Sequence, residues 1–583
     1  MTISDMLLKG FPNQQFKWVE TIQDLWSGYG SIQRWASNES RVIVKHIKFP
    51  TERMHSRGWN SEFGHLRKVR SYEVERYWYS HYAKYCPAKL PKLLFKDEKN
   101  GEQFLVLEDL NSTGFAQRVV HPSFKQINSC LDWLAQFHAY FLESSNDGLW
   151  DEGTYWNLDS RPEEFENMQK GNLKNYASVI DYKLRNARYQ TIVHGDAKMA
   201  NFCFSKTDSV AAVDFQYVGR GCGIKDVIYF LSSIQDDELI QNYDHFVNYY
   251  FEKLGCYIGR KNNKLEKEWR GLYKFAWADF NRFLKGWSPG HWKINSYVEE
   301  ITDEAINEIT QELMFREVVG CFKKAAIKAG KYIQENINST FSVRFKRDDL
   351  SDASRVLTSI DLAAQTLIFD EIEQVKAKYD FGILSEEHKD DNSRFNKAFF
   401  ICVDPLDGTL PFTEKVAGYS VSIALVTQSG DAVCGVIYDP VGENVYSAYR
   451  GGGGFKNSIP IELNYTSSVF TFICDRSFSQ SSDYELLLQK LSEKNKAKGV
   501  SEVKVISHGG AAMNAIWCIE HAPAVYAKPP KIKEGGGSIW DFAASTCIFH
   551  ELGLRASDYK GEALDLNRKR STFMNHKGVW FQA

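Results

Sequence analysis

A change of pattern between residues 288 and 312 constrains the fold of this chain more than any other sequence feature. A Ser-Pro-Gly turn signal opens this stretch, an acidic helical segment follows it, and a clear amphipathic helix comes next. A chain of 583 residues is long enough to bury several cores. We therefore predict a first domain over residues 1–300, a linker over residues 301–311 and a second domain over residues 312–583.

Charge and composition exclude several classes of protein. The chain has 71 Lys and Arg against 74 Asp and Glu, a balance that argues against a nucleic-acid polymer as its partner. No apolar run is long enough to cross a membrane, and the N-terminus lacks the pattern of a signal peptide. The 11 cysteines are an odd number without a CxxC pair, which is typical of a reducing compartment. We expect a cytoplasmic protein without a membrane partner.

The first half combines short strands with long helices. Apolar, β-branched runs at residues 42–47 and 103–107 predict buried strands, and the segment between them reads as a helix. Residues 130–143 predict a long amphipathic helix. Two further strand-like runs precede residues 194 and 214, so polar residues follow each strand directly. The expected fold class of this half is α+β.

Three polar residues in this half have the order that phosphoryl transfer from ATP requires. Asp196 and Asn201 lie on one short loop, and Asp214 follows the next strand. A carboxylate in the first position can take the proton of an acceptor hydroxyl, while the other two oxygen ligands can hold Mg²⁺ on the phosphates. The alternative for the His-Gly-Asp stretch alone is an ordinary turn with a buried histidine.

A strand lysine and a helix glutamate extend this constellation. Lys45 lies in the run at residues 42–47, where it can pair with the α- and β-phosphates of ATP. Glu75 lies on the following helix and can hold that lysine, although Glu73 is a rival for this role. Each residue taken alone is better explained as a solvated surface charge. The whole set in this order favours an ATP site.

These segments resemble the aminoglycoside phosphotransferase and choline kinase superfamily, in its ecdysteroid-kinase-like branch. The resemblance covers about residues 20–300 and rests on SYEVERYWY, LVLEDL, LAQFHA, VHGDAKMANFCF and VDFQ. It implies a protein-kinase-like bilobal fold with Asp196 as catalytic base and with Asn201 and Asp214 as Mg²⁺ ligands. It further implies an ATP site formed by Lys45, Glu75 and the backbone around Glu108 and Leu110, with Asp226 supporting the catalytic loop.

Two positions depart from the kinase pattern. The segment at residues 27–31 is a poor glycine-rich loop, because it contains one GxG and no third glycine at kinase spacing. Gln216 stands where protein kinases have the glycine of their DFG motif. This second departure favours a small-molecule kinase over a protein kinase with a flipping switch.

The second half carries a set of carboxylates that suits hard metal ions. The segment DPLDGT, residues 404–409, follows a buried strand at residues 397–403, and its two acids can converge on metal from a tight loop. Two metal ions held in this way can activate water and stabilise a leaving oxygen. The full predicted ligand set is Glu386, Asp404, the carbonyl of Leu406, Asp407 and Asp541. Taken alone, Glu386 fits a solvated turn, and Asp541 fits a charge at a helix N-terminus.

This half resembles the inositol monophosphatase superfamily over about residues 312–583, in its 3′(2′),5′-bisphosphate nucleotidase-like branch. The resemblance rests on KRDD, TSIDLAAQTLI, DPLDGT, GYSVSIALV, YRGGGGF and WDFAAS. It implies a layered α/β inositol-monophosphatase-like fold, Mg²⁺ as cofactor, inhibition by lithium, and small-molecule substrates. It assigns the activation of water to Thr409, Asp361 and Glu387. A homodimer formed through this half stays an open alternative.

Three features of the second half depart from its relatives. Gly-Ala replaces the usual Gly-Ser within residues 507–514, and an acidic residue is missing from the HAPAVYAKPP segment. An insertion also separates Lys346 from Thr358. These departures concern the substrate more than the metal chemistry.

The two halves together predict a bifunctional enzyme. The first half would phosphorylate a hydroxyl of a small molecule with ATP and Mg²⁺, and the second would hydrolyse a phosphate monoester with Mg²⁺. One alternative is that a single half is catalytic and the other is a nucleotide- or metabolite-binding regulatory module. A pure sensor is the non-enzymatic alternative, but a binder would not need two complete sets of catalytic carboxylates.

Overall fold

The computed structural model describes residues 2–25, 28–49, 61–234, 236–259, 262–338, 344–345, 356–357, 359–465, 468–496, 500 and 502–583. The chain divides into two compact units, Met1–Ile309 and Thr310–Ala583. The KRDD segment at residues 346–349, Thr358 and part of the glycine segment at residues 27–31 lie outside the described residues.

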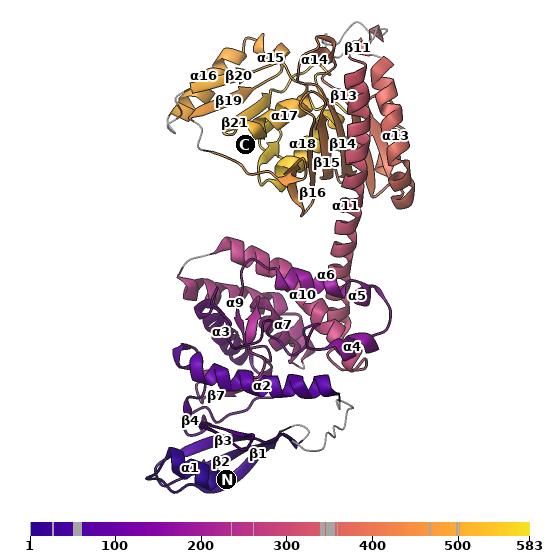
Figure 1. Ribbon diagram of the computed structural model, residues 1–583. Helices are drawn as coiled ribbons and strands as arrows, with labels where there is room; N and C mark the ends of the chain where they lie inside the picture. Colours follow the sequence, from indigo (N-terminus) through magenta and orange to yellow (C-terminus); the bar gives the residue numbers. More distant parts are fainter. Residues whose placement is uncertain are drawn as a thin grey trace. The chain divides into compact units, whose positions relative to one another are not determined.

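The first unit begins with an antiparallel five-stranded sheet in the order β1-β2-β3-β5-β4. Its strands are β1 (Lys17–Asp24), β2 (Gly30–Ala36), β3 (Arg41–Ile47), β4 (Leu93–Lys99) and β5 (Glu102–Glu108). Two helices pack against this sheet, α1 (Ile3–Gly10) and α2 (Glu62–His81) (Figure 1).

The alternation of side chains along β3 decides what each face of this sheet carries. Val42 and Val44 are buried in a cluster with residues of α1. Because successive side chains of a strand point to opposite faces, Ile43 and Lys45 face the other way. Ile43 packs against the core that contains Val74 of α2. The strand therefore presents Lys45 to the same face that α2 covers.

The rest of the first unit is mostly helical. Its helices are α3 (Phe124–Tyr140), α4 (Pro162–Asn167), α5 (Asn172–Asn175), α6 (Ala177–Arg185), α7 (Ile224–Ser232), α8 (Asp237–Ile240), α9 (Tyr243–Ile258) and α10 (Asn263–Trp287). Two small antiparallel strand pairs join β6 (Thr191–Val193) to β9 (Gly219–Gly221) and β7 (Phe202–Phe204) to β8 (Val210–Ala212). These pairs flank the loops that carry Asp196 and Asp214.

The second unit contains two larger sheets. A seven-stranded sheet has the order β12-β13-β14-β15-β16-β17-β18, and a five-stranded sheet has the order β20-β19-β21-β23-β22. The first consists of β12 (Gly382–Ser385), β13 (Phe399–Asp407), β14 (Ser420–Thr427), β15 (Ala432–Asp439), β16 (Asn444–Tyr449), β17 (Gly453–Lys456) and β18 (Ile459–Pro460). The second consists of β19 (Val469–Ile473), β20 (Glu502–Ile506), β21 (Ala524–Lys528), β22 (Arg555–Ser557) and β23 (Val579–Gln582). A short pair, β10 (Arg344–Phe345) and β11 (Val356–Leu357), is separate.

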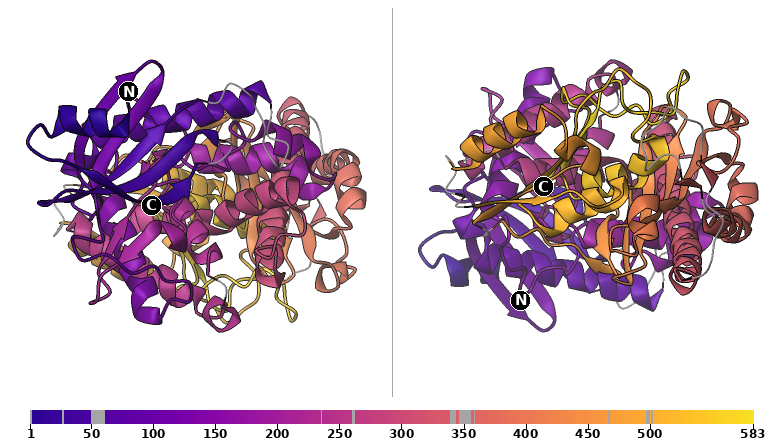
Figure 2. Two further views of the ribbon diagram at one scale, coloured as in Figure 1. Left: turned by 90° about the horizontal axis from the view of Figure 1, so that it is seen from below. Right: turned by 90° about the horizontal axis from the view of Figure 1, so that it is seen from above.

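Helices and sheets alternate in layers in this unit, as expected for a layered α/β fold (Figure 1). Its helices are the part of α11 (Ser296–Glu335) from residue 310 on, α13 (Ser359–Tyr379), α14 (Thr409–Thr413), α15 (Arg476–Ser479), α16 (Tyr484–Lys496), α17 (Ala511–Glu520) and α18 (Ile539–Glu551). In β13, Ile401 and Val403 are buried with α11 and α13, whereas Phe400 and Cys402 are buried with α17 and α18. Both faces of the large sheet are therefore covered. Helices α11 and α13 lie side by side (Figure 2), and the Cys321 thiol donates to the Glu371 carbonyl between them.

The predicted linker needs a correction. Residues 301–311 lie within α11, which continues from the first unit into the second. Ile301, Ala305 and Ile309 recur at helical spacing and are buried in the core of the first unit. Burial of this apolar stripe makes residues 301–309 part of the core of the first unit.

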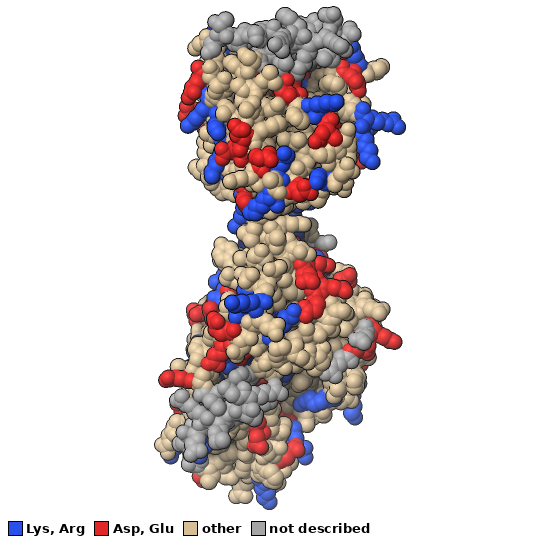
Figure 3. All heavy atoms as spheres, turned by 90° about the vertical axis from the view of Figure 1, so that its right-hand side faces the viewer, with Lys and Arg blue, Asp and Glu red and all other residues tan. Residues whose placement is uncertain are grey.

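The described surface carries both signs of charge. Acidic and basic side chains are interspersed over the face drawn in Figure 3. This pattern agrees with the near-neutral net charge of −3. Among the described residues, no helix combines the length and the apolar character that crossing a membrane demands.

Candidate active sites

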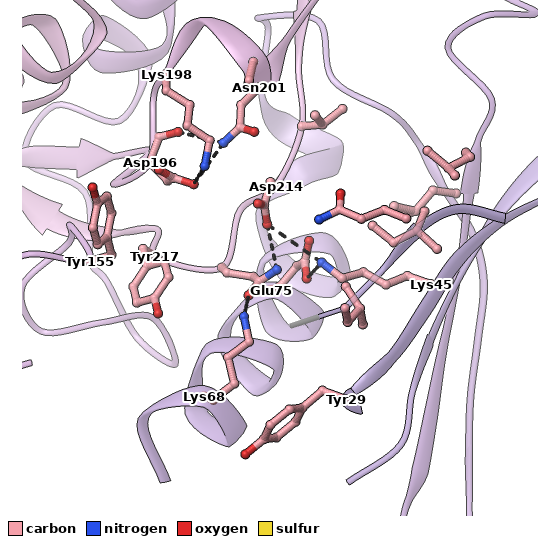
Figure 4. Close-up of a pocket in the computed structure, with 18 of the residues that line it drawn as sticks. Tyr29, Lys45, Lys68, Glu75, Tyr155, Asp196, Lys198, Asn201, Asp214 and Tyr217 are labelled. Carbon is pink, nitrogen blue, oxygen red and sulfur yellow. Dashed lines mark hydrogen bonds and ion pairs between the residues drawn. The ribbon is translucent and has the colours of Figure 1, made fainter. Parts of the chain in front are cut away.

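A cavity of about 700 Å³ in the first unit brings together most of the polar residues predicted there (Figure 4). Its lining includes Lys45, Glu75, Glu108, Leu110, Asp196, Asn201 and Asp214. These seven candidates therefore share one cavity, although β3, α2, β5 and two loops supply them, whereas Asp226 does not line it. Further lining residues were not predicted from the sequence, among them Arg67, Lys68, Tyr155, Arg161, Lys198 and Tyr229.

The strand lysine is paired with Glu75 and not with its rival. Lys45 Nζ lies 2.6 Å from Glu75 Oε2, and both side chains are buried. Burial raises the pKa of Glu75, and the charge of Lys45 opposes that rise. Glu73 instead lies near the surface beside Arg70. Lys45 Nζ is also 3.8 Å from Asp214 Oδ1, which links this pair to the predicted metal ligand.

A buried carboxylate holds the loop that carries Asp196. Asp226 accepts hydrogen bonds from the backbone N–H groups of His194 at 2.5 Å and of Gly195 at 2.9 Å. The His138 ring nitrogen lies 3.1 Å from the same carboxylate. Gly195 has a φ of +78°, and a Cβ atom there would lie 2.0 Å from the carbonyl oxygen of Tyr217. The loop therefore needs both this glycine and Asp226, as the resemblance implied.

We expect Asp226→Asn to destabilise the first unit by about 2–4 kcal/mol, because an amide cannot satisfy both backbone donors and leaves buried groups unpaired. The same change should disorder the Asp196 loop and reduce phosphoryl transfer. Urea unfolding, followed by intrinsic fluorescence, measures the stability change. Asp147→Asn, at an exposed position, is the matched control. Equal stability of Asp226→Asn and the parent would contradict this role.

The Asp196 carboxylate is oriented by three donors. Tyr229 donates to Oδ1 at 2.9 Å, and Lys198 donates to Oδ2 at 2.9 Å. The side-chain amide of Asn201 donates to Oδ2 at 3.1 Å and to the backbone carbonyl of Asp196 at 2.8 Å. These bonds place Asn201 beside the predicted base and hold the carboxylate in one orientation.

Asp214 adopts a backbone conformation that is uncommon for a residue with a side chain, with a φ of +69°. The amide of Gln216 donates to Asp214 Oδ1 at 2.8 Å, and Lys68 donates to the Gln216 carbonyl at 2.8 Å. Gln216 therefore links Asp214 to α2, which a glycine at position 216 could not do. Burial alone would raise the pKa of Asp214, but Lys45 and the other nearby lysines outweigh burial and lower it. Burial also lowers the pKa of Lys68 to about 8.

The predicted adenine-binding segment lies at the end of β5. Glu108 accepts a hydrogen bond from Lys89 Nζ at 2.8 Å, and its backbone N–H donates to the Lys92 carbonyl at 2.9 Å. Leu110 is buried two residues further on. Both residues line the cavity, and their contact with adenine stays a prediction.

Three carboxylates converge in the second unit. Oxygen atoms of Asp404, Asp407 and Asp541 lie within 4.8 Å of one another. The first two residues end β13, and Asp541 lies in the first turn of α18. Strand and helix thus bring together acids that are more than 130 residues apart in the sequence, as the predicted ligand set requires.

Asp404 is the most enclosed of the three. One of its oxygens accepts the Leu406 backbone N–H at 3.1 Å, while the other accepts no hydrogen bond from the described residues. Burial raises the pKa of Asp404 well above its usual range, and the charges of Glu386 and Asp541 raise it further. A buried carboxylate oxygen without a donor, surrounded by like charges, fits a divalent cation as its partner.

Asp407 is fixed by the start of a helix. It accepts the backbone N–H groups of Ala511 at 3.0 Å and Ala512 at 2.8 Å, in the first turn of α17. A Cβ atom on Gly510 would lie 2.5 Å from Asp407 Oδ2, so glycine leaves room for the carboxylate. Burial and the charge of Asp541 raise the pKa of Asp407 to about 7 in spite of these two bonds.

Asp541 serves two purposes at once. Its carboxylate accepts the backbone N–H of Ser538 at 2.5 Å in a capping box at the start of α18. Asp541 therefore does act as a charge at a helix N-terminus, but the same carboxylate also faces Asp404 and Asp407. Burial raises the pKa of Asp541.

The other predicted residues of this site lie after β12, after β13 and in the first turn of α13. Glu386 directly follows β12 and donates its backbone N–H to the Val403 carbonyl at 3.2 Å, which places it next to β13. The Glu387 carbonyl accepts from Gln365 of α13 at 3.2 Å. Thr409 Oγ1 lies 3.5 Å from the Leu406 carbonyl, and Asp361 is buried in the first turn of α13. Their catalytic roles stay predictions.

One basic residue near this site was not predicted. Lys528 ends β21, and its Nζ lies 2.5 Å from Asp475 Oδ2. The Tyr526 hydroxyl also donates to Asp475 at 2.9 Å. The charge of Lys528 partly offsets the rise in the pKa of Asp407 and Asp541. In the sequence, only the Tyr-x-Lys spacing at Tyr526 and Lys528 could have indicated that Lys528 lies near the acids.

Comparison with known proteins finds a match in each part of the chain. Residues 315–580 match the model of the inositol monophosphatase family, and residues 150–260 match that of the ecdysteroid kinase-like family. An inositol-1-monophosphatase from Mesorhizobium japonicum is 30% identical over 240 residues, which cover 41% of this chain and 84% of that protein.

Two further proteins to which the chain is similar are both named CysQ. The 3′(2′),5′-bisphosphate nucleotidase CysQ from Escherichia coli is 28% identical over 227 residues, covering 38% of this chain and 82% of that protein. The crystal structure of CysQ from Bacteroides thetaiotaomicron is 25% identical, with a TM-score of 0.38, and the match covers 46% of this chain and 98% of that one.

Proposed function

The chain belongs to the inositol monophosphatase family through residues 315–580, and from this premise we propose that its second unit hydrolyses a small phosphate monoester with Mg²⁺. The cluster of Asp404, Asp407 and Asp541 carries the proposal, because three carboxylates this close together, two of them buried, repel one another unless a metal ion balances their charge.

The proposed metal ligands are Glu386, Asp404, the Leu406 carbonyl, Asp407 and Asp541. When bound, Mg²⁺ would acidify a coordinated water and neutralise charge on the phosphate. The protein's own contribution is positional: the N–H groups of Ala511 and Ala512 hold Asp407, and the Ser538 N–H holds Asp541. We assign Thr409, Asp361 and Glu387 to orienting the attacking water and accepting its proton.

The substrate of the second unit is proposed as a class. The names of the relatives point to inositol phosphates and to bisphosphate nucleotides. Inositol 1-phosphate and adenosine 3′,5′-bisphosphate are therefore the first two esters to test, followed by a wider panel of monoesters.

Removing the metal should abolish this hydrolysis. We expect phosphate release to fall to background in excess EDTA, to return with added Mg²⁺ and to decrease with lithium. The reason is that the cluster offers only oxygen donors, which bind hard cations. Phosphate release measured with a colorimetric assay checks this, and full activity in EDTA would contradict it.

For the first unit we propose ATP-dependent phosphorylation of a hydroxyl on a small molecule. The supporting observation is that Asp196 and Asp214 share one cavity with the buried Lys45–Glu75 pair. Asp196 would take the proton of the acceptor hydroxyl as its oxygen bonds to the γ-phosphorus and the bond to ADP breaks. Asn201 and Asp214 would hold Mg²⁺, and Lys45 would contact the α- and β-phosphates.

We propose that both units are catalytic and that they act in one pathway. The alternative is that one unit works while the other binds a nucleotide or metabolite for regulation. The first unit retains the base, the predicted metal ligands and the paired lysine together, a set that binding alone does not require. Separate assays of both reactions decide between these alternatives.

A further inference from the structure

Three lysines of the described residues line the first-unit cavity, and they come from three different elements (Figure 4). Lys45 lies on β3, Lys68 on α2 and Lys198 on the loop after β6. Lys45 is paired with the Glu75 carboxylate at 2.6 Å. Lys198 is paired with the Asp196 carboxylate at 2.9 Å. Lys68 differs from both in the groups that it contacts.

The ammonium group of Lys68 contacts neutral partners. Its Nζ donates to the side-chain oxygen of Gln216 at 2.8 Å and lies 4.7 Å from the centre of the Tyr72 ring. Among the described residues, it forms no ion pair with a carboxylate. A lysine ammonium group carries three N–H donors, and the Gln216 oxygen accepts from one of them. Lys68 can therefore also donate to an anion that enters the cavity.

The face of α2 that carries Lys68 is the face that supports the predicted ATP site. Lys68, Ser71 and Glu75 are three and four residues apart, so they lie on one side of the helix. The Ser71 hydroxyl lies 3.3 Å from the same Gln216 oxygen that accepts from Lys68. Glu75, two turns further on, holds Lys45. One helix face thus presents both a positioned lysine and its own lysine to the cavity.

Gln216 connects Lys68 to the predicted metal ligand. Its amide nitrogen donates to Asp214 Oδ1 at 2.8 Å, while its oxygen accepts from Lys68. Lys45 Nζ lies 3.8 Å from the same Asp214 oxygen. A single side-chain amide therefore separates the Lys68 ammonium group from Asp214, where the proposed Mg²⁺ would hold the phosphates of the nucleotide.

The glycine segment leaves a need for another phosphate contact. In protein kinases a glycine-rich loop covers the phosphates. Residues 27–31 contain one GxG and no third glycine at kinase spacing. Tyr29 stands between these glycines, and its hydroxyl lies 2.5 Å from His65 Nδ1 of α2. A cation on α2 could supply the phosphate contact that this short segment lacks.

The γ-phosphate is the group that fits the position of Lys68 best. In the proposed reaction it lies between Asp196, which takes the hydroxyl proton, and the Mg²⁺ held at Asp214. Lys45 is assigned to the α- and β-phosphates, and Lys198 already balances Asp196. Enzymes neutralise the charge on a phosphoryl group in transfer with lysine, arginine or metal ions. Of the three cavity lysines, Lys68 is available for this.

We propose that Lys68 is a specificity-determining residue of the first unit and that its ammonium group binds the terminal phosphate of a nucleoside triphosphate. The proposal rests on the proposed kinase function of this unit. It means that α2 distinguishes triphosphate from diphosphate, because a diphosphate has no phosphate at this position. The diphosphate product would therefore bind without the Lys68 contact.

The test compares two nucleotides that differ by the terminal phosphate. AMPPNP, a triphosphate analogue that resists cleavage of its terminal bond, and ADP are each titrated with Mg²⁺ into the full chain and followed by calorimetry. An Asp404→Asn background prevents hydrolysis by the second unit. We expect Lys68→Met to bind MgAMPPNP about tenfold more weakly than the parent, the difference that one charge-assisted hydrogen bond provides. Its affinity for MgADP should be nearly unchanged, which also shows that the variant is folded.

Three further variants separate a direct contact from an indirect one. Lys68→Arg should keep part of the preference for MgAMPPNP, because it retains the charge. Gln216→Met removes the link to Asp214 but leaves Lys68 in place, so it should keep most of the preference. Lys84→Met is the matched control and should behave like the parent, because exposed Lys84 also lies 4.7 Å from a tyrosine ring, that of Tyr85.

The proposal is overturned if Lys68→Met weakens both nucleotides equally, complete loss of both included, or if it keeps the parent's preference. It is also overturned if Gln216→Met loses the preference to the same extent as Lys68→Met, because Lys68 would then act only through Gln216 and Asp214. A parent that binds MgAMPPNP and MgADP equally well would overturn it too. Failure of the parent to bind either nucleotide would instead refute the kinase function itself.

Discussion

Asp196→Asn is expected to reduce ATP-dependent phosphorylation by about a hundredfold to ten-thousandfold, the range that a positioned general base contributes. An asparagine amide cannot accept the hydroxyl proton. In the variant, the amide oxygen can still accept from Lys198 and Asn201, and the amide nitrogen can face Tyr229, whose hydroxyl can accept as well as donate. The loss should therefore appear in kcat while MgATP binding is retained.

Transfer of labelled phosphate from ATP measures this change, with hydrolysis of a phosphate ester followed in the same preparation. Asp208→Asn is the matched control, because Asp208 lies in a turn between β7 and β8 with a φ of +65°, which asparagine also adopts. Unchanged transfer in Asp196→Asn would remove Asp196 as the base. Loss of both activities would show that the two units do not work independently.

Asp404→Asn is expected to reduce ester hydrolysis by more than about a hundredfold. Loss of a residue that only hydrogen-bonds to a metal ligand costs about 10–100-fold in metal affinity or activity, and loss of a ligand itself should cost more. Phosphorylation by the first unit should continue. The burial of Asp404 among like charges also predicts an effect on stability. Without metal, the variant should be at least as stable as the parent, because a neutral amide relieves that repulsion.

Thermal unfolding with and without Mg²⁺ separates these effects. A ligand that binds the folded state raises its stability, so Mg²⁺ should raise the melting temperature of the parent and have little effect on Asp404→Asn. Asp431→Asn, at the exposed turn between β14 and β15, should respond to Mg²⁺ like the parent. An equal Mg²⁺ response in Asp404→Asn would contradict the assignment of Asp404 as a ligand.

Local patterns were enough to predict much of both sites. Lys45 could be predicted because it stands within an apolar, β-branched strand run that is followed by a helix carrying Glu75. The acids of DPLDGT could be predicted because they follow a buried strand in a tight turn. In these cases the relevant contact is set by a few neighbouring residues.

Other parts depend on packing between distant segments. Lys198 and Tyr229 orient Asp196, yet nothing in their own surroundings distinguishes them from surface or core residues. Arg67 reaches the carbonyl of Ser160 only because α2 packs against that segment. The backbone donors of Ala511 to Asp407 carry no side-chain signal at all. The predicted linker was wrong because acidic residues on the exposed face of α11 concealed the buried stripe on its other face.

The presence of both units in one chain favours action in series. If the second unit hydrolysed the direct product of the first, the pair would consume ATP without a net product. In series, the first unit would phosphorylate an intermediate, other enzymes would modify it, and the second unit would remove the phosphate. We expect the Asp196→Asn variant to hydrolyse the isolated kinase product less efficiently than other esters. Equal efficiency would favour an opposing cycle.

The central claim is that one chain contains two independent catalytic sites, and a crossed measurement with labelled ATP tests it most directly. The parent, Asp196→Asn and Asp404→Asn would each receive γ-labelled ATP with a mixture of small alcohols, and in parallel a panel of phosphate monoesters. The account predicts that labelled ester forms with the parent and Asp404→Asn only, while phosphate release from the panel occurs with the parent and Asp196→Asn only. Loss of both reactions in either variant, or absence of either reaction in the parent, would contradict it.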